Sequence, residues 1–251
     1  ARRGRPCRGA PLAVPAGAQS SPCNTAYFFG NGILTTFDRA VTSASALAKT
    51  INDRAAEPGS QILCSIPVGL AYNDTHGPLV DLFEAYVQQS NESDPNSVFW
   101  QIIEGVIPPS PLFIRLARAA AERNIAVDLG TQLDSYRATL HSGGDVVVVS
   151  HSQGNFFANS AYAALNAADR SHFKIVAVAT PADRVAGQAT PFAYTTLIGD
   201  SIVAVPGALA ANITNDLSCM PYFVCHDFVG AYLGGWRSGR RIANLALGLN
   251  D

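Results

Sequence analysis

The chain has 251 residues, of which 48% are hydrophobic and 14% are charged. This composition is that of a globular protein with a sizeable core and excludes a disordered chain. The formal net charge of −2 gives no indication of a nucleic-acid partner, and no apolar run is long enough for a membrane-spanning helix.

The first 22 residues are predicted to form a loose tail. They contain four arginines and four prolines and show no hydrophobic periodicity. Within them, Ala16-Gly17-Ala18 has the A-x-A pattern of a signal-peptide cleavage site. We therefore expect residues 23–251 to form the folded domain, and a secreted or periplasmic location is favoured over a cytoplasmic one.

The rest of the chain alternates predicted strands with predicted helices. Apolar, β-branched segments predict buried strands, and helical periodicity with capping signals predicts helices. The expected strands are 26–29, 61–69, 146–149, 173–181 and 194–200. The expected helices are 36–55 with Thr35 or Thr36 as cap, 78–90, 97–107, 111–124, 128–143, 154–168 and a last one from about His226. This alternation is typical of an α/β fold, in which a mostly parallel sheet carries helices on both faces.

One junction in this pattern stands out. The stretch DVVVVSHSQGNFFANSAY, from Asp145 to Tyr162, joins a valine-rich strand to a helix through a run of small and polar residues. A strand that ends abruptly and reverses into a helix strains the residue at the turn. That geometry lifts one side chain, here Ser152, above the carboxyl edge of the sheet. An ordinary strand-to-helix turn that happens to contain a serine is the alternative.

The pentapeptide Ser150-His151-Ser152-Gln153-Gly154 resembles the nucleophile elbow, G-x-S-x-G, of the α/β-hydrolases. Ser150 replaces the first glycine, at a place where the strand and helix backbones nearly touch and a small side chain is required. Residues 25–248 also resemble this family, in its lipase-like form, in the order and spacing of their elements. The resemblance implies an α/β-hydrolase-type fold and a serine nucleophile at Ser152.

A serine hydroxyl needs a base to accept its proton and a third group to hold that base. In the α/β-hydrolases these follow the serine in the order Asp or Glu, then His. Only His172 and His226 follow Ser152. His172 directly precedes a predicted strand, at the wrong edge of the sheet, so His226 is predicted to be the base. A helix cap or a surface histidine is the alternative role for His226.

Two carboxylates compete for the role of the acid. Asp200 ends the predicted strand 194–200, which follows the nucleophile strand by two, where the family most often carries its acid. Asp183 lies after the preceding strand, and its neighbour Arg184 suggests a simple ion pair. Asp200 is therefore favoured and Asp183 is the alternative, with Asp216 and Asp227 as outsiders.

The reaction also needs donors for the tetrahedral oxyanion. The first is expected to be the backbone N–H of Gln153, directly after the nucleophile. By the same resemblance, FFGNGIL occupies the place of the His-Gly-X loop of lipases, with Asn31 in place of the histidine. The second donor would then be the N–H of Ile33, with Asn31 and Gly32 supporting the loop. A plain glycine turn that ends a strand is the alternative.

Residues 76–124 exceed what the core of this fold requires. Their apolar members favour a helical cap or lid over an acyl-chain site, and an additional core layer is the alternative. The expected substrate is an ester of a fatty or aryl acid, with transient contact to a lipid surface. An acyltransferase, a thioesterase, an amidase or a non-catalytic binding protein with this fold stays open. The apolar members are Phe99, Trp100, Ile102, Ile103, Ile107, Leu112 and Phe113.

Five cysteines give no CxxC pair and no His/Cys spacing typical of zinc, so no metal or cofactor is expected. Cys219 and Cys225 flank a short loop and are predicted to form a disulfide, which would indicate an oxidising compartment. Cys64 lies in a predicted buried strand, which favours a free apolar thiol; a disulfide with Cys23, at the edge of the tail, is the alternative.

Overall fold

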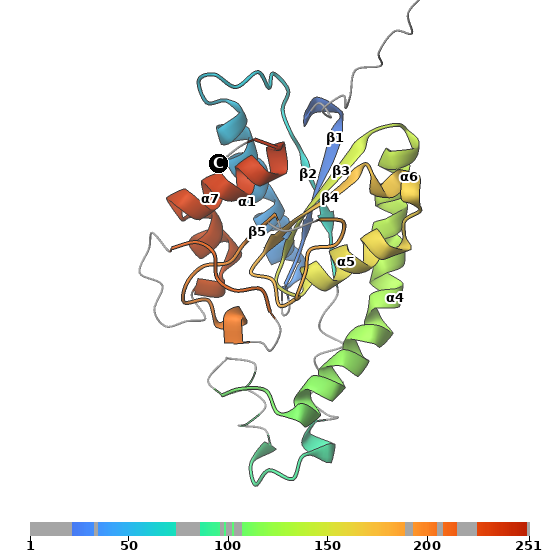
Figure 1. The fold of residues 1–251 in the computed structure, drawn as a ribbon, viewed down its shortest axis with the longest axis vertical. Helices are drawn as coiled ribbons and strands as arrows, with labels where there is room; N and C mark the ends of the chain where they lie inside the picture. Colours follow the sequence, from blue (N-terminus) through green and yellow to red (C-terminus); the bar gives the residue numbers. More distant parts are fainter. Residues whose placement is uncertain are drawn as a thin grey trace, which may run out of the picture.

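The computed structural model shows a five-stranded sheet flanked by helices (Figure 1). This confirms the predicted α/β architecture. For residues 117–128 the description covers the backbone only. The residues that the structure describes are 22–32, 35–73, 86–95, 98, 102, 107–188, 193–204, 208–214 and 225–249.

The sheet has the strand order β2-β1-β3-β4-β5, and each pairing is parallel. The valine-rich strand β3 lies at its centre, and every residue of β3 after Asp145 is buried. Because the strands are parallel, their carboxyl ends lie at one edge of the sheet. The strands are β1 (Thr25–Gly30), β2 (Val68–Ala71), β3 (Asp145–His151), β4 (Phe173–Val178) and β5 (Tyr194–Thr195).

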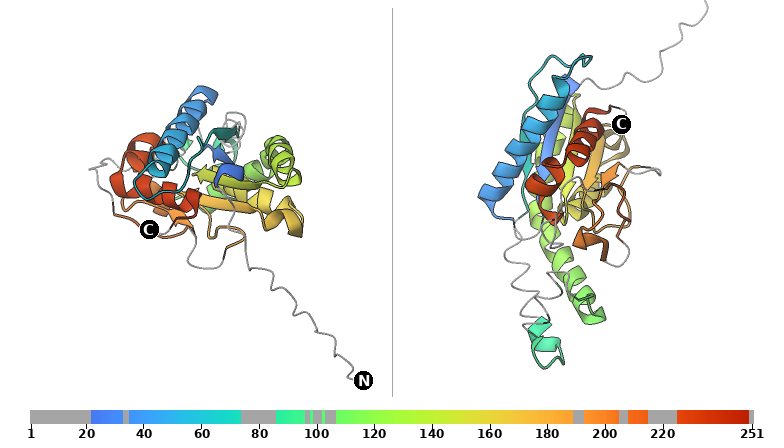
Figure 2. Two further views of the ribbon diagram at one scale, coloured as in Figure 1. Left: turned by 90° about the horizontal axis from the view of Figure 1, so that it is seen from above. Right: turned by 90° about the vertical axis from the view of Figure 1, so that its left-hand side faces the viewer.

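Helices cover both faces of the sheet (Figures 1 and 2). Successive residues of β3 point to opposite faces, so Val147 and Val149 join one apolar core while Val146 and Val148 join the other. The first core is closed by α1 (Phe37–Ala55), the π-helix η4 (Phe228–Leu233) and α7 (Trp236–Leu247). The second is closed by α4 (Pro111–His141) and α5 (Gly154–Ala164), with α6 (Ala167–Arg170) beside them.

The capping prediction for the first helix is confirmed, because Thr36 is the N-cap of α1 and accepts a hydrogen bond from the Arg39 N–H. The two helices predicted at 111–124 and 128–143 are wrong as separate elements. They form one continuous helix of 31 residues, α4. The interior of α4 contains no proline. Gly130 lowers helical stability by only about 1 kcal/mol relative to alanine, which is too little to end a helix that continues for many residues before and after it.

Figure 1 shows that the amino-terminal part of α4 extends beyond the sheet toward residues 86–95. Tyr86 and Phe113 meet there with ring centroids 5.8 Å apart, and both are buried. Much of the predicted cap, including 76–85, lies outside the described residues. The cap therefore stays a prediction.

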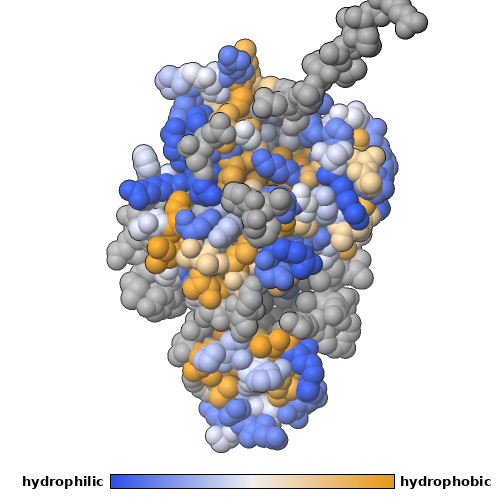
Figure 3. Space-filling model, in the orientation of Figure 1, coloured by the Kyte–Doolittle hydropathy of each residue, from blue (hydrophilic) through white to orange (hydrophobic). Residues whose placement is uncertain are grey.

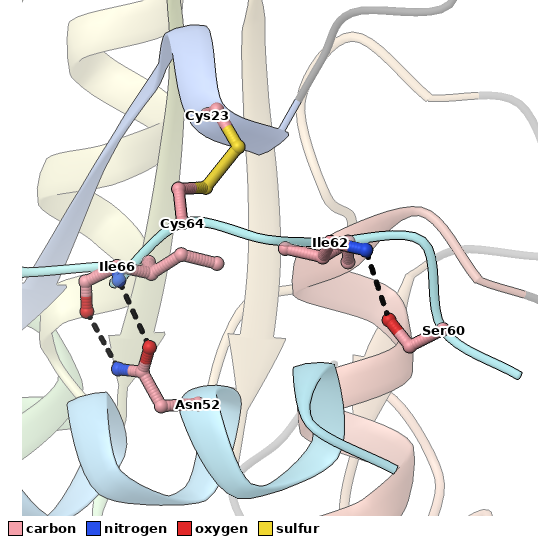
Figure 4. The surroundings of a disulfide bond; sticks show 6 residues. All are labelled: Cys23, Asn52, Ser60, Ile62, Cys64 and Ile66. Carbon is pink, nitrogen blue, oxygen red and sulfur yellow. Dashed lines mark hydrogen bonds between the residues drawn. A yellow bond between two sulfur atoms is a disulfide. The ribbon is translucent and has the colours of Figure 1, made fainter. Parts of the chain in front are cut away.

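The predicted strand 61–69 is wrong over most of its length, because β2 begins only at Val68. Backbone groups of this segment bond to the side chain of Asn52 on α1 instead of to a neighbouring strand. The Asn52 side-chain amide donates to the Ile66 carbonyl (2.8 Å) and accepts from the Ile66 N–H (2.9 Å) (Figure 4). Cys64 lies in the same segment and forms a disulfide with Cys23. The interpretation of Cys64 as a free thiol is therefore wrong.

Two elements near the carboxyl terminus also differ from their predictions. The predicted strand 194–200 is regular only over β5, followed by a parallel bridge between Leu197 and Ile213 and by the 3-10 helix η2 (Ser201–Ala204). The predicted last helix is two elements, η4 and α7, separated by Gly234 and Gly235.

Cys225 is disulfide-bonded, but Cys219 lies outside the described residues, so the predicted pairing stays a prediction. None of the helices in the described ranges is long and apolar enough to cross a membrane. The face shown in Figure 3 mixes polar side chains with small apolar patches.

The Cys23–Cys64 disulfide closes a long segment, since its cysteines are 41 positions apart. Replacing both cysteines by alanine should lower the free energy of unfolding by about 2–4 kcal/mol, because the unfolded chain gains entropy. Urea denaturation measures this difference. Leu63→Ala is the control, because its side chain is 96% exposed beside Cys64 and should change stability little. A double variant as stable as the control would contradict the prediction.

Candidate active site

The turn between β3 and α5 holds Ser152 in an unusual backbone conformation. Its φ of 53° lies in the left-handed region, which residues other than glycine rarely adopt. The Ser152 N–H donates to the Val178 carbonyl of β4 (3.0 Å), and its own carbonyl accepts from the Asn155 N–H in the first turn of α5 (3.1 Å). The turn therefore places Ser152 at the carboxyl edge of the sheet, as predicted.

Close backbone contacts explain the small residues around this turn. A Cβ atom on Gly154 would lie 2.7 Å from the Gly30 carbonyl oxygen and 2.8 Å from that of Asn31. A Cβ atom on Gly32 would lie 2.9 Å from the Cβ of Ser152. The loop that leaves β1 thus packs directly against the turn, and side chains at these glycines would force it away.

Ser150, the residue that departs from the elbow pattern, is engaged in a buried hydrogen-bond network. Its hydroxyl donates to the Asn155 side-chain oxygen (2.8 Å). The Asn155 amide donates in turn to the carbonyls of Ser152 (2.8 Å) and Val178 (3.1 Å). This network fastens the strained turn to β4 on its inner side. Sequence reasoning missed Asn155, whose signal was a polar residue on a helix face that is otherwise apolar.

Ser152, His226 and Asp200 form a continuous line of hydrogen bonds. The Nε2 atom of His226 lies 2.9 Å from the Ser152 hydroxyl. Its Nδ1 atom lies 2.9 and 3.0 Å from the two carboxylate oxygens of Asp200. The side chain of His226 is 24% exposed and that of Asp200 is fully buried. The acid end of the line is thus closed to solvent while the histidine remains accessible.

The buried carboxylate of Asp200 has two further donors. The Ile202 N–H donates to Oδ1 (2.8 Å) and the Tyr232 hydroxyl donates to Oδ2 (2.6 Å). Ile202 belongs to η2 and Tyr232 to η4, so donors from these two irregular helices meet at this carboxylate. Tyr232 was missed by sequence reasoning, because nothing local distinguishes it from a core tyrosine.

The competing candidates lie elsewhere. Asp183 forms an ion pair with Arg184 (3.0 Å) in which both side chains are 67% exposed. Asp227 is the N-cap of η4, and Asp216 lies outside the described residues. His172 pairs with Asp145 at the opposite edge of the sheet, where β3 and β4 begin.

His151, inside the pentapeptide, is a second histidine of the site that sequence reasoning passed over. Its ring lies 4.8 Å from that of His226 and 5.3 Å from that of Phe228, measured between centroids. Burial, and secondarily the neighbouring His226, hold the pKa of His151 well below its usual value, against a hydrogen bond to the His226 backbone that acts in the opposite direction. His151 is therefore uncharged at neutral pH.

One expected oxyanion donor lies in the described structure and the other does not. Gln153 directly precedes α5, and no described residue accepts a hydrogen bond from its backbone N–H. Ile33 lies outside the described residues, so its role stays a prediction. A helix amino terminus carries partial positive charge, which makes the Gln153 position suitable for an anion.

Asn31 does order the loop after β1, through paired amide contacts with Asn73 after β2. The Asn31 side chain donates to the Asn73 carbonyl (3.0 Å) and accepts from the Asn73 N–H (2.8 Å). The Asn73 side chain donates to the Asn31 carbonyl (2.6 Å) and accepts from Gln132 on α4 (2.9 Å). Because Asn31 and Asn73 are completely buried, this network fixes the exits of β1 and β2 against α4.

No metal centre competes with this site in the part of the chain that the structure describes, where no group of three or more His, Cys, Asp or Glu side chains could hold an ion. Neither a comparison with protein-family models nor one with curated proteins finds a match. The hydrogen-bonded arrangement of Ser152, His226 and Asp200 is therefore the feature of this chain that indicates a function.

The contact between the turn and the β1 loop can be tested with two glycines. Gly154→Ala should lower the free energy of unfolding by about 1–3 kcal/mol, because its methyl group overlaps two backbone oxygens. Gly130→Ala is the matched control, since its new methyl group meets nothing within 4 Å and alanine favours a helix interior by about 1 kcal/mol. Urea denaturation should show opposite signs for the two variants, and equal effects would contradict the packing described.

Proposed function

We propose that the protein is a serine hydrolase of the α/β-hydrolase type that cleaves carboxylic esters through an acyl-enzyme on Ser152. The observation that carries the proposal is the line of hydrogen bonds from Asp200 through His226 to Ser152. A nucleophile, a base and a group that orients the base are what acyl transfer requires of a protein. Their order along the chain, Ser then Asp then His, is that of the α/β-hydrolases.

The proposed reaction begins when Ser152 Oγ attacks the ester carbonyl carbon and its proton passes to His226 Nε2. The tetrahedral intermediate collapses when the C–O bond to the alcohol breaks, and His226 returns the proton to the departing oxygen. Water then attacks the carbonyl carbon of the acyl-enzyme and gives one proton to His226. The bond between that carbon and Ser152 Oγ breaks, His226 returns the proton to Ser152 Oγ, and the carboxylic acid is released. Throughout, Asp200 holds the Nδ1–H and stabilises the imidazolium.

The negative charge on the carbonyl oxygen needs donors that are already in place. The backbone N–H of Gln153 supports this part of the proposal, because it lies next to Ser152 and has no acceptor among the described residues. The start of α5 adds the partial positive charge of a helix terminus. The second donor proposed by resemblance is the N–H of Ile33.

The elbow supports the family-level part of the proposal. Ser152 follows the central strand of a parallel sheet, has the positive φ expected of a strained turn, and is packed against the loop after β1. Ser150 departs from the family pattern, and its bond to Asn155 shows how a serine is accommodated there.

The substrate class and the setting follow from other parts of the chain. The apolar composition of residues 76–124 favours an ester with a fatty or aryl acyl group, presented with transient contact to a lipid surface. The Cys23–Cys64 disulfide supports an oxidising compartment, as expected for a secreted or periplasmic enzyme.

Removal of the nucleophile is the first test. Ser152→Ala should lower kcat/KM for a p-nitrophenyl ester by at least about 10⁴-fold, because Ser152 carries the hydroxyl that is hydrogen-bonded to His226 Nε2. Ser150→Ala is the matched control and should keep most of the activity, since the Asn155 amide still holds the carbonyls of Ser152 and Val178 when the Ser150 hydroxyl is removed. If Ser150→Ala abolishes hydrolysis and Ser152→Ala does not, the proposed nucleophile is wrong.

The assignment of the acid is tested separately. Asp200→Asn should lower kcat by about 10²–10⁴-fold, because an amide cannot stabilise the imidazolium or hold the required tautomer. Asp183→Asn should leave kcat unchanged, since Asp183 is exposed and paired with Arg184. Steady-state kinetics on both variants decides between them, and a large loss for Asp183→Asn with none for Asp200→Asn would reverse the assignment.

A further inference from the structure

Tyr232 is a completely buried tyrosine whose hydroxyl reaches the acid of the proposed triad. It donates to Asp200 Oδ2 at 2.6 Å and accepts from the Leu197 N–H at 3.2 Å. Tyr232 belongs to the π-helix η4, which begins two residues after His226. π-Helical turns are rare and frequently occur at functional sites. Here the N-cap of the π-helix η4, Asp227, directly follows His226, and the η4 residue Tyr232 donates a hydrogen bond to the Asp200 carboxylate.

The carboxylate needs this donor because its side chain is fully buried. Burial disfavours an ionised carboxylate unless hydrogen bonds replace the lost water. In the described structure the donors to Asp200 are His226 Nδ1, the Ile202 N–H and the Tyr232 hydroxyl. The Ile202 N–H donates to Oδ1. In the described structure, Oδ2 accepts from His226 and from the Tyr232 hydroxyl.

Tyr232 can act only as a donor toward Asp200. Burial, followed by the adjacent charge of Asp200, raises the pKa of Tyr232 well above its ordinary value, so the phenol keeps its proton at all physiological pH values. The Leu197 N–H occupies the phenol oxygen as an acceptor and directs its proton toward the carboxylate. The phenol is thus held between the Leu197 N–H and the Asp200 carboxylate, two groups that are three residues apart in the chain.

We propose that Tyr232 is a positioning residue of this site, whose hydroxyl fixes the orientation of Asp200 and weakens the affinity of the Asp200–His226 pair for a proton. This inference rests on the proposed function. The hydroxyl shares the negative charge of Asp200, so the carboxylate attracts the proton on His226 less strongly than it would alone. Removing the hydroxyl should therefore leave the full negative charge of Asp200 acting on that proton.

Among the residues that the structure describes, the other titratable group beside this pair is His151, from the end of β3. Its ring lies 4.8 Å from that of His226 and 6.0 Å from that of Tyr232. His151 is uncharged at neutral pH, because burial lowers its pKa. Because His151 is uncharged and Tyr232 bonds to the carboxylate, removal of the Tyr232 hydroxyl should change the hydrogen bonding of Asp200 without changing the charge of His151.

Tyr232→Phe removes the hydroxyl and keeps the ring. The variant should lower kcat by about tenfold with little change in KM, as expected from the loss of one hydrogen bond to a charged group. The acid limb of its kcat/KM profile should move to higher pH by about 0.5–1 unit, because the pair holds its proton more tightly. A merely structural loss would lower the melting temperature without moving this limb.

Tyr27→Phe is the matched control. Tyr27 is 3% exposed and belongs to the same apolar core as Tyr232. Removal of its hydroxyl should cost stability in the same way while leaving the acid limb in place. A shift of equal size in Tyr27→Phe would overturn the inference.

A second variant tests the same bond without removing it. A fluorinated tyrosine introduced at position 232 is a stronger donor, so the acid limb should move to lower pH, opposite to Tyr232→Phe. If the limb stays at the wild-type position in both variants, or moves in the same direction in both, the inference is wrong while the proposed function stands. If the wild-type protein hydrolyses no ester and Ser152 forms no acyl-enzyme, the proposed function is wrong and the inference falls with it.

Discussion

The close contact between the exit of β1 and the turn after β3 is the constraint on which the proposed site depends. Gly154 must be a glycine because the carbonyl oxygens of Gly30 and Asn31 occupy the space of a side chain. The same contact brings the β1 loop against Ser152, beside the position of the oxyanion in the proposed reaction. Backbone approach, and not side-chain chemistry, therefore decides which residues can surround the proposed nucleophile.

The second requirement is electrostatic, because the proposed mechanism needs a carboxylate beside His226 and the side chain of Asp200 is fully buried there. Asp200 meets it through donors from two elements that are neither strands nor regular α-helices, η2 and η4. Irregular backbone is useful here because it leaves N–H and hydroxyl donors free to converge on one point. The regular sheet supplies the rigid position of the turn, and the irregular segments supply the charge stabilisation.

Apolar periodicity was sufficient for the α/β architecture and for the strand-to-helix turn at Ser152, although β2 and β5 are shorter than the strands predicted there. The pairing of Asp200 with His226 was expected from the family resemblance, and the structure places the two side chains in hydrogen-bond contact. The sequence was insufficient where long-range contacts override local preference. The β-branched pattern around Cys64 predicted a strand, but Asn52 on α1 and the disulfide to Cys23 hold that segment instead. Tyr232 could not be found either, since its role depends on a π-helical turn that no local pattern announces.

The central claim is that Ser152 is an activated nucleophile, and a fluorophosphonate probe tests it most directly. The probe reacts only with a serine whose proton is taken by a correctly placed base. Peptide mapping by mass spectrometry after labelling of the folded protein should place the adduct on Ser152, and labelling should disappear after denaturation. An unlabelled protein, or an adduct on another residue, would contradict the account.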